Sequence, residues 1–186
     1  SDLVTCATGT DTGGSVRLPA AYCGLTGLKV SKNYLPTDGI YPLSHTLDTP
    51  GPMARSVADV ALMLAVMRGA EAWAIDQDMK IGQGLFAFQR ASVRGLKLGI
   101  IDNSERQVCD ADMLKSYDAA VDRLASLGAE IAVFSAPDRY GDLADANGAI
   151  TIFEGYGYHK ALYEVAKNPM DEDLRKRMRT GRGLTA

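Results

Sequence analysis

The chain has 186 residues, enough to bury a hydrophobic core without disulfides, and this length corresponds to one domain or to one domain with a small appendage. Apolar residues make up 46% and charged residues 23%, and these fractions exclude wholesale disorder. The net charge of −3 shows no excess of lysine and arginine, which a surface that binds nucleic acid normally needs.

The first half of the chain predicts two strands, a long loop and a buried helix. Apolar segments near Leu3–Thr8 and Leu25–Ser31 predict strands, and the glycine-rich turn Gly9–Ser15 follows the first of them. Prolines keep the stretch Ser31–Pro52 out of any regular helix, so it is predicted to be a loop. An S-x-x-D start signal and a following glycine predict a helix over Arg55–Arg68. Its apolar residues cover nearly the whole circumference, so this helix should be largely buried.

The second half predicts a strand–helix–strand unit and then helices. The stretch Ala70–Val93 is weakly patterned and is predicted to be a surface loop. Strands are predicted at Leu96–Ile101 and Ala129–Phe134, with an amphipathic helix, Asp110–Leu127, between them. This order is typical of a parallel βαβ crossover. The segment Leu143–Ala166 is predicted to be mostly helical.

The C-terminal segments hold further apolar and basic positions. Four side chains of the predicted helical segment are candidate core contacts: Phe153, Tyr158, Leu162 and Val165. Asn168 and Pro169 predict a break, and a short charged helix is predicted to begin at Asp171. The basic run from Arg175 to Arg182 comes just after acidic residues and is predicted to be a solvated helix face. These elements together place the chain in the α/β class.

The cysteines, the histidines and the hydropathy of the sequence indicate the compartment of the protein and argue against a metal site and a membrane span. Three scattered cysteines and two distant histidines form no disulfide framework and no metal-binding motif. The sequence contains no apolar run long enough to span a membrane. We therefore expect a cytoplasmic protein without a metal site, which binds neither membranes nor, directly, nucleic acid.

The segment from Gly9 to Lys29 is the densest in chemistry, and two nucleotide-binding interpretations of the sequence are weak. Gly9 and Gly14 have the spacing of a P-loop, but Ser15 occupies the position that needs a lysine. A dinucleotide fingerprint could be placed on the stretch that begins at Gly82, but no convincing strand precedes it.

A serine nucleophile is a third interpretation. A Ser–His–Asp triad would need His45 or His159, and nothing in the sequence places either beside Ser15. Gly13 and Gly14 allow consecutive N–H groups to point into one concavity, which suits an oxyanion next to the Ser15 hydroxyl. The alternative is a tight glycine turn with a capping serine, and composition alone favours this alternative.

Two motifs, which occur in order along the chain, favour the serine nucleophile over the structural turn. The segments are Gly9–Lys29 (GTDTGGSVRLPAAYCGLTGLK) and Ser44–Leu64 (SHTLDTPGPMARSVADVALML). Together they closely resemble the amidase signature family, over about residues 8–67. The resemblance implies an α/β/α fold with a mixed sheet flanked by helices, and we expect at least three of the four predicted strands to share one sheet.

The resemblance also implies roles for the turn. The serine of the D-T-G-G-S motif attacks the amide carbonyl in that family, so Ser15 is the expected nucleophile. The backbone N–H groups of Thr12, Gly13, Gly14 and Ser15 would form the oxyanion hole. Asp11 and Arg17 occupy motif positions that would hold the loop in shape, and a purely structural ion pair is an equal alternative.

The family's mechanism also uses a lysine base and a bridging serine, both of which precede the D-T-G-G-S motif. No lysine precedes Ser15 here, and Lys29 corresponds to a structural G-L-K strand rather than to that base. We therefore expect the chain to be a piece of a longer amidohydrolase, acting through a serine acyl-enzyme, and to be inactive alone. The alternative is a non-catalytic homologue, or a component of a multi-chain complex like the A component of an amidotransferase.

The resemblance implies an organisation and partners as well. The chain would be one incomplete amidase signature domain, with a motif core over 8–67, a βαβ-like unit over 96–134 and a helical segment over 143–180. The expected partners are a small-molecule amide, the rest of the parent chain or a partner protein, and a second copy in a homo-oligomer. Tyr34, Tyr41 and His45 are candidates for a wall of the acyl pocket, with a packed surface loop as the alternative.

Overall fold

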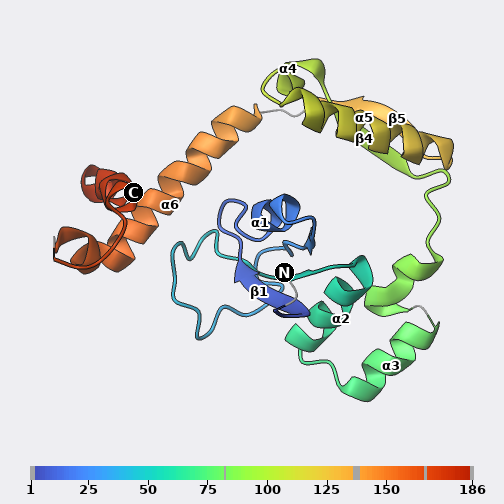
Figure 1. The fold of residues 1–186 in the computed structure, drawn as a ribbon, viewed down its shortest axis with the longest axis horizontal. Helices are drawn as coiled ribbons and strands as arrows, with labels where there is room; N and C mark the ends of the chain where they lie inside the picture. Colours follow the sequence, from blue (N-terminus) through green and yellow to red (C-terminus); the bar gives the residue numbers. More distant parts are fainter. Residues whose placement is uncertain (1–2, 82, 136–138, 166, 185–186) are drawn as a thin grey trace. The chain divides into compact units, whose positions relative to one another are not determined.

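The computed structural model describes residues 3–81, 83–135, 139–165 and 167–184. The chain divides into two compact units, Ser1–Phe88 with Ala144–Ala186, and Gln89–Leu143 (Figure 1). Within the described ranges, no helix has both the length and the hydropathy needed to cross a bilayer. Gly82, which would begin the dinucleotide fingerprint, lies outside the described residues.

The sheet of the first unit is antiparallel and has the strand order β1-β3-β2. Its strands are β1 (Cys6–Thr10), β2 (Thr26–Gly27) and β3 (Pro50–Ala54). The two predicted strands of this half are therefore present, each with shifted or shorter bounds. β3 begins inside the predicted loop Ser31–Pro52, so that expectation is wrong at its C-terminal end.

The prolines of β3 explain why it was not predicted. Proline cannot donate to a ladder and is unusual in a central strand. The Pro52 carbonyl accepts a hydrogen bond from Leu28 N at 3.1 Å, so the N side of Pro52, which lacks a hydrogen, faces the β2 side of the sheet. On that side the ladder contains only Thr26 and Gly27, which pair with residues beyond Pro52. The missing donors therefore cost the sheet little.

A glycine on β3 is in close contact with the segment after β2. A Cβ built on Gly51 would lie 2.2 Å from the Leu28 carbonyl oxygen and 3.6 Å from Val16 Cγ1. A separation of 2.2 Å is far inside van der Waals contact, and the blocking atom belongs to the backbone. The sheet can close at this place only because residue 51 lacks a side chain.

Helices of the first unit follow the sheet strands. α1 (Arg17–Tyr22) comes directly after the glycine turn, and α2 (Val57–Met67) follows β3. The start signal of α2 is confirmed, since the Ser56 side chain accepts from Asp59 N. One face of α2 is buried: Val60, Ala61, Leu64 and Ala65. Val57 and Val66 are exposed, so the expected burial around most of the circumference is wrong.

The weakly patterned stretch after α2 is helical rather than a loop. α3 (Ala72–Ile81) and the 3₁₀ helix η1 (Gly84–Arg90) occupy most of Ala70–Val93. Ile75 and Phe86 are buried and pack with two alanines of α2. Ile75 and Phe86 are enough to pack α3 and η1 against α2, but two apolar side chains so far apart give little periodic signal in the sequence.

The second unit confirms the predicted βαβ crossover. β4 (Lys97–Ile101) pairs in parallel with β5 (Glu130–Phe134), and α4 (Asn103–Arg106) and α5 (Ala111–Ser126) connect them. The Asp110 side chain caps α5 by accepting from Asp112 N. The predicted apolar face of α5 is partly covered at four positions: Leu114, Tyr117, Val121 and Leu124.

The four predicted strands do not share one sheet. β1 and β2 belong to the antiparallel sheet, and β4 and β5 form a separate parallel pair. The expectation that at least three of them would share a sheet is therefore wrong within the described ranges, although the α/β class is confirmed. Periodicity identifies a strand from its own side chains, whereas pairing depends on partners far away in the chain.

The helical segment near the C-terminus is confirmed, but its buried face was predicted wrongly. α6 (Tyr140–Glu164) covers the predicted range up to Glu164, and Ala166 lies outside the described residues. The four predicted core contacts are all exposed: Phe153, Tyr158, Leu162 and Val165. Tyr156 and Tyr163 are buried instead, because they pack against Met178 of α7 (Glu172–Arg179). Both sets have helical spacing, and only the partner helix selects one of them.

The predicted solvated basic face is wrong at Arg175, whose side chain is 2% exposed. Its Nη1 donates to the carbonyls of Leu162, Tyr163 and Val165 at 3.3, 3.1 and 2.9 Å, and Nη2 donates to that of Asn168 at 2.6 Å. The last carbonyls of a helix have no partner within the helix. Arg175 supplies donors at the end of α6 and joins α6 to α7.

Candidate active site

The candidate turn lies between β1 and α1 (Figure 1). Ser15, within this turn, is exposed. Gly14 has φ +124, a conformation that side chains rarely adopt, and a Cβ there would lie 2.8 Å from Leu18 Cδ1. The Gly14 carbonyl accepts from Leu18 N at 2.7 Å, which ties the turn to the first residues of α1. The chain therefore turns sharply at Gly14 and places the Ser15 side chain in solvent.

A buried carboxylate organises this turn from inside. Asp11 is 0% exposed and accepts from Gly14 N at 2.8 Å. Arg17 binds both of its oxygens, through Nε at 2.9 Å and Nη2 at 3.0 Å. Burial alone would raise the pKa of Asp11, but the hydrogen bonds from Arg17 and Gly14 outweigh it and hold the pKa below its ordinary value of 3.8. Asp11 is therefore an ionised anchor for the turn.

The hydrogen bonds of the turn leave some N–H groups unused. In the described part of the chain, no hydrogen bond uses the N–H groups of Thr12, Gly13 or Ser15, whereas that of Gly14 donates to Asp11. Three unused donors beside an exposed hydroxyl can stabilise an oxygen that gains negative charge.

Thr12 is held by two side chains that were not predicted from the sequence. Its Oγ1 donates to Asp48 Oδ1 at 2.5 Å, and its carbonyl accepts from Asn147 Nδ2 at 3.0 Å. The second oxygen of Asp48 accepts from Leu43 N and Ser44 N at 2.8 and 2.9 Å. Asp48 lies in the second motif, so a signal for it existed, whereas no pattern in the sequence points to Asn147.

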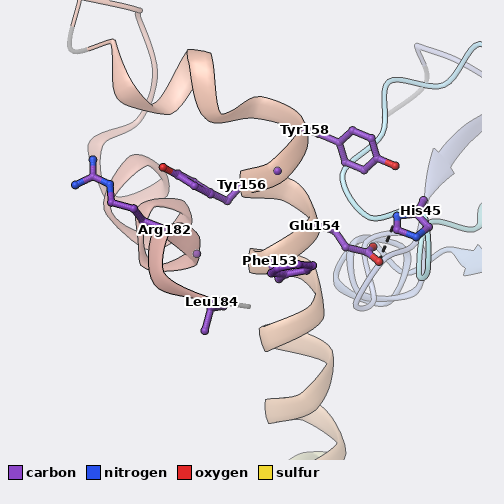
Figure 2. A pocket seen from close by; sticks show the side chains of 9 residues that line it. His45, Phe153, Glu154, Tyr156, Tyr158, Arg182 and Leu184 are labelled. Carbon is purple, nitrogen blue, oxygen red and sulfur yellow. Dashed lines mark ion pairs between the residues drawn. The ribbon is translucent and has the colours of Figure 1, made fainter. Parts of the chain in front are cut away.

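The loop before β3 is bound to α6 through Glu154. The Glu154 carboxylate accepts from the hydroxyls of Ser44 and Thr46 and from Thr46 N, and it forms an ion pair with His45, Nδ1 to Oε1 at 3.3 Å. Figure 2 shows His45 and Glu154 facing one another. Burial alone would raise the pKa of Glu154, but these hydrogen bonds and His45 hold it below its ordinary value of 4.5.

The histidines and Lys29 have partners other than Ser15. His159 is buried, and its Nε2 is hydrogen-bonded to the Pro42 carbonyl. Lys29 Nζ donates to the Val30 carbonyl at 3.2 Å. Among the described residues, no hydrogen bond joins the Ser15 hydroxyl to a histidine or to Lys29.

A pocket of about 370 Å³ lies between α6 and the 3₁₀ helix η2 (Thr180–Gly183) (Figure 2). Its walls are mainly aromatic and apolar, with polar groups at the rim: His45, Phe153, Glu154, Tyr156, Tyr158, Arg182 and Leu184. Of the three predicted wall residues, only His45 lines it. Tyr41 stacks on His159 with ring centroids 4.6 Å apart, and the Tyr34 hydroxyl accepts from Arg68 Nη1 at 2.6 Å. Ser15 is not among the lining residues of this pocket.

The acidic, histidine and cysteine side chains form no candidate metal site in the ranges that the structure describes. No three of them lie there in an arrangement that could hold a metal ion. The three cysteines are exposed and free.

Comparison with known proteins gives a consistent family. The family described as Amidase matches residues 1–183. The A component of glutamyl-tRNA(Gln) amidotransferase from Bdellovibrio bacteriovorus is 37% identical over 137 residues, covering 74% of this chain and 28% of that protein. An amidase from Pseudomonas putida is 33% identical over 189 residues, covering 97% of this chain and 39% of that protein.

Comparison with solved structures supports the same family. A crystal structure of an amidase superposes with a TM-score of 0.77 at 25% identity, covering 97% of this chain and 37% of that chain. The chain thus spans between 28 and 39% of the length of these relatives. Since the family match covers nearly all 186 residues and includes both motifs, the chain belongs to the Amidase family, the amidase signature proteins, and has their fold.

Proposed function

We propose that the protein containing this chain hydrolyses a carboxamide, with Ser15 as the nucleophile. The single observation that supports this most is the geometry of the turn: an exposed hydroxyl stands beside three N–H groups without acceptors in the described residues. The family and relatives named amidase support the same reaction class.

In the proposed reaction, Ser15 Oγ forms a bond to the amide carbonyl carbon and loses its proton to a base. The carbonyl oxygen becomes an oxyanion, which binds the N–H groups of Thr12, Gly13 and Ser15. Gly14 supplies the turn conformation, while its own N–H donates to Asp11. The C–N bond then breaks, the amine leaves with a proton, and water hydrolyses the acyl-enzyme to the acid and free Ser15.

The base in this proposal is not one of the residues described above. The family resemblance implies a lysine and a bridging serine, which precede the motif in the parent chain. The 186 residues alone are then inactive, because an unassisted serine hydroxyl is protonated at neutral pH. No cofactor takes part in the proposed steps.

A second candidate role is that of an amidotransferase component. Several relatives are named as the A component of glutamyl-tRNA(Gln) amidotransferase, among them two at 37% and 34% identity. In this case the parent protein would work in a complex with partner proteins. A preference for glutamine over simple aliphatic and aromatic amides, together with co-purifying chains, would favour the amidotransferase role.

The test compares Ser15→Ala with Ser31→Ala in the full-length protein. Ser31 is exposed and its hydroxyl has no partner within the described residues, so it is a matched control. We expect Ser15→Ala to lower kcat/KM for ammonia release by on the order of 10⁴-fold or more, and to abolish labelling by a fluorophosphonate probe. Ser31→Ala should stay within about twofold. Equal labelling of wild type and Ser15→Ala would contradict the proposal.

A further inference from the structure

Helix α6 reaches the candidate turn through one side chain, Asn147. Its Nδ2 donates to the Thr12 carbonyl at 3.0 Å, across 135 positions of sequence. Asn147 is half-buried, and its own carbonyl accepts from Thr151 Oγ1 at 2.9 Å. It therefore sits within a regular part of α6, which gives the side chain a fixed base from which to reach the turn.

Peptide geometry turns this contact into an effect on the neighbouring donor. The Thr12 carbonyl and the Gly13 N–H belong to one planar trans peptide, so they point in opposite directions. Whatever fixes the carbonyl also fixes the N–H. Because Asn147 holds the Thr12 carbonyl toward α6, the Gly13 N–H points away from α6, and it has no acceptor within the described residues.

Thr12 has a second anchor, and the two anchors act on different parts of the residue. The Thr12 side chain is held by Asp48 through Oγ1, which fixes where the residue lies. The plane of the following peptide can still rotate about ψ of Thr12 unless its carbonyl is held. Asn147 supplies that restraint, so its contribution is the direction of the N–H rather than the position of Thr12.

The fit between Asn147 and Gly13 is close. A Cβ built on Gly13 would lie 3.0 Å from Asn147 Oδ1 and 3.9 Å from its Cγ. Gly13 has no positive φ, so its backbone does not itself require glycine. The side-chain amide of Asn147 therefore occupies the space that a side chain at position 13 would need, while its NH₂ group reaches the carbonyl one residue earlier.

We propose that Asn147 is a positioning residue of the reaction, which aims the Gly13 N–H at the developing oxyanion. This inference rests on the proposed function of the turn. A donor to the Thr12 carbonyl also polarises the peptide and strengthens the Gly13 N–H as a donor. The N–H gains most when the oxygen carries a full negative charge, so the effect falls on kcat more than on KM.

Two variants in the full-length protein test the inference. Asn147→Leu keeps similar volume but has no donor, and we expect kcat for a simple amide to fall roughly tenfold or more while KM stays within about twofold. Removal of a whole oxyanion donor costs about 10²–10³-fold, which sets the upper bound for misdirecting one. Asp145→Asn, on an exposed position of the same helix without a partner in the described residues, is the matched control and should stay within about twofold.

Asn147→Asp provides a readout that a merely structural role would not move. The introduced carboxyl can donate to the Thr12 carbonyl only when protonated, and repels it when ionised. We expect the ratio of variant to wild-type kcat to rise as the pH falls, whereas the ratio for Asn147→Leu stays flat. Taking the ratio at each pH cancels the titration of the catalytic base.

The outcomes separate this inference from the proposed function. Wild-type activity and labelling that depend on Ser15, with kcat unchanged in Asn147→Leu, would overturn the role of Asn147 alone. Two results together would also overturn it, in favour of a structural role. In Asn147→Leu, the fall in kcat would match a loss of folded protein measured by circular dichroism, and the kcat ratio of Asn147→Asp to wild type would not change with pH. Wild-type activity that survives Ser15→Ala would overturn both.

Discussion

Two buried charges, Asp11 and Arg175, stand at the ends of helices and are stabilised by backbone groups of opposite sign. Asp11, before α1, accepts from N–H groups up to six positions later and from Arg17. Arg175, on α7, donates to carbonyls seven to thirteen positions earlier, at and after the end of α6. The comparison teaches that burial of a charge is tolerated where several backbone groups and one side chain of opposite charge bind it.

The two charges differ in what they hold. Asp11 shapes the turn that carries Ser15, so we expect its loss to change both the chemistry and the stability. Arg175 joins two helices and contacts no residue of the turn, so we expect its loss to change stability alone. Three predictions test this distinction, in order of decreasing effect.

Asp11→Ala should have the largest effect. It removes the acceptor of Gly14 N–H and both partners of the Arg17 guanidinium, so the turn loses its internal anchor. We expect kcat/KM of the full-length protein to fall by more than about 100-fold, since small misplacements at a reacting centre cost that much. The free energy of unfolding should fall by about 2–3 kcal/mol in a denaturant titration.

Asp38→Asn is the control for this change, because Asp38 is exposed and has no partner in the described residues. It should leave both quantities nearly unchanged. Retention of wild-type kcat/KM in Asp11→Ala would show that the turn keeps its shape without the buried carboxylate.

Arg175→Met should lower stability but not activity. Methionine fills similar volume but removes a donor from four carbonyls, of which those of Leu162 and Val165 still accept from Asn168. We expect the free energy of unfolding to fall by about 2–4 kcal/mol. Measured well below the unfolding temperature, kcat/KM should stay within about threefold. Arg177→Met, on an exposed position of the same helix, should change stability by less than about 0.5 kcal/mol. Equal stability of the two variants would mean that water replaces the Arg175 donors at no cost.

The third and smallest expected effect is on pH dependence: acid should weaken the contribution of Asp11 to stability more than that of Arg175. The pKa of Asp11 in the folded protein lies below its ordinary 3.8, so its stabilisation is present above that pH and is lost as the pH falls through the folded pKa. The stability difference between wild type and Asp11→Asn should therefore shrink as the pH falls below about 3.8. The difference between wild type and Arg175→Met should change less there. The guanidinium and its four carbonyl acceptors do not titrate, and its carboxylate partner, Glu172, is 64% exposed, so this ion pair contributes little. Parallel pH dependence of both differences in denaturant titrations would refute this.

The candidate site was predicted from the sequence where its contacts are local. Asp11, Ser15 and Arg17 lie within seven residues of one motif, and the ion pair of Asp11 with Arg17, one of the two alternatives given for these residues, is present. Asn147 acts on Thr12 across 135 positions, and an asparagine in a helix carries no signal of such a contact. Arg175 was hidden in the same way, since a basic run ordinarily indicates a solvated face.

The fold was predicted to a similar extent, for similar reasons. The cap of α2 and the βαβ unit follow from local patterns, and both are confirmed. The sequence did not predict β3, because prolines are typical of breaks in regular structure. Its prolines are tolerated because β2 is short and pairs only with residues of β3 beyond Pro52. The buried face of α6 was predicted wrongly because two apolar stripes compete, and α7 decides between them.

The contact of Gly51 with the Leu28 carbonyl has a consequence for the genetic tolerance of the protein. Every base change in a glycine codon that alters the amino acid adds a Cβ or ends the chain, and the space at position 51 is filled by a backbone oxygen 2.2 Å away. In a saturation library selected for function, position 51 should thus be depleted of variants about as strongly as the proposed nucleophile. A position without any part in the chemistry would then look catalytic to a genetic screen, and only the distance to Leu28 would tell the two apart.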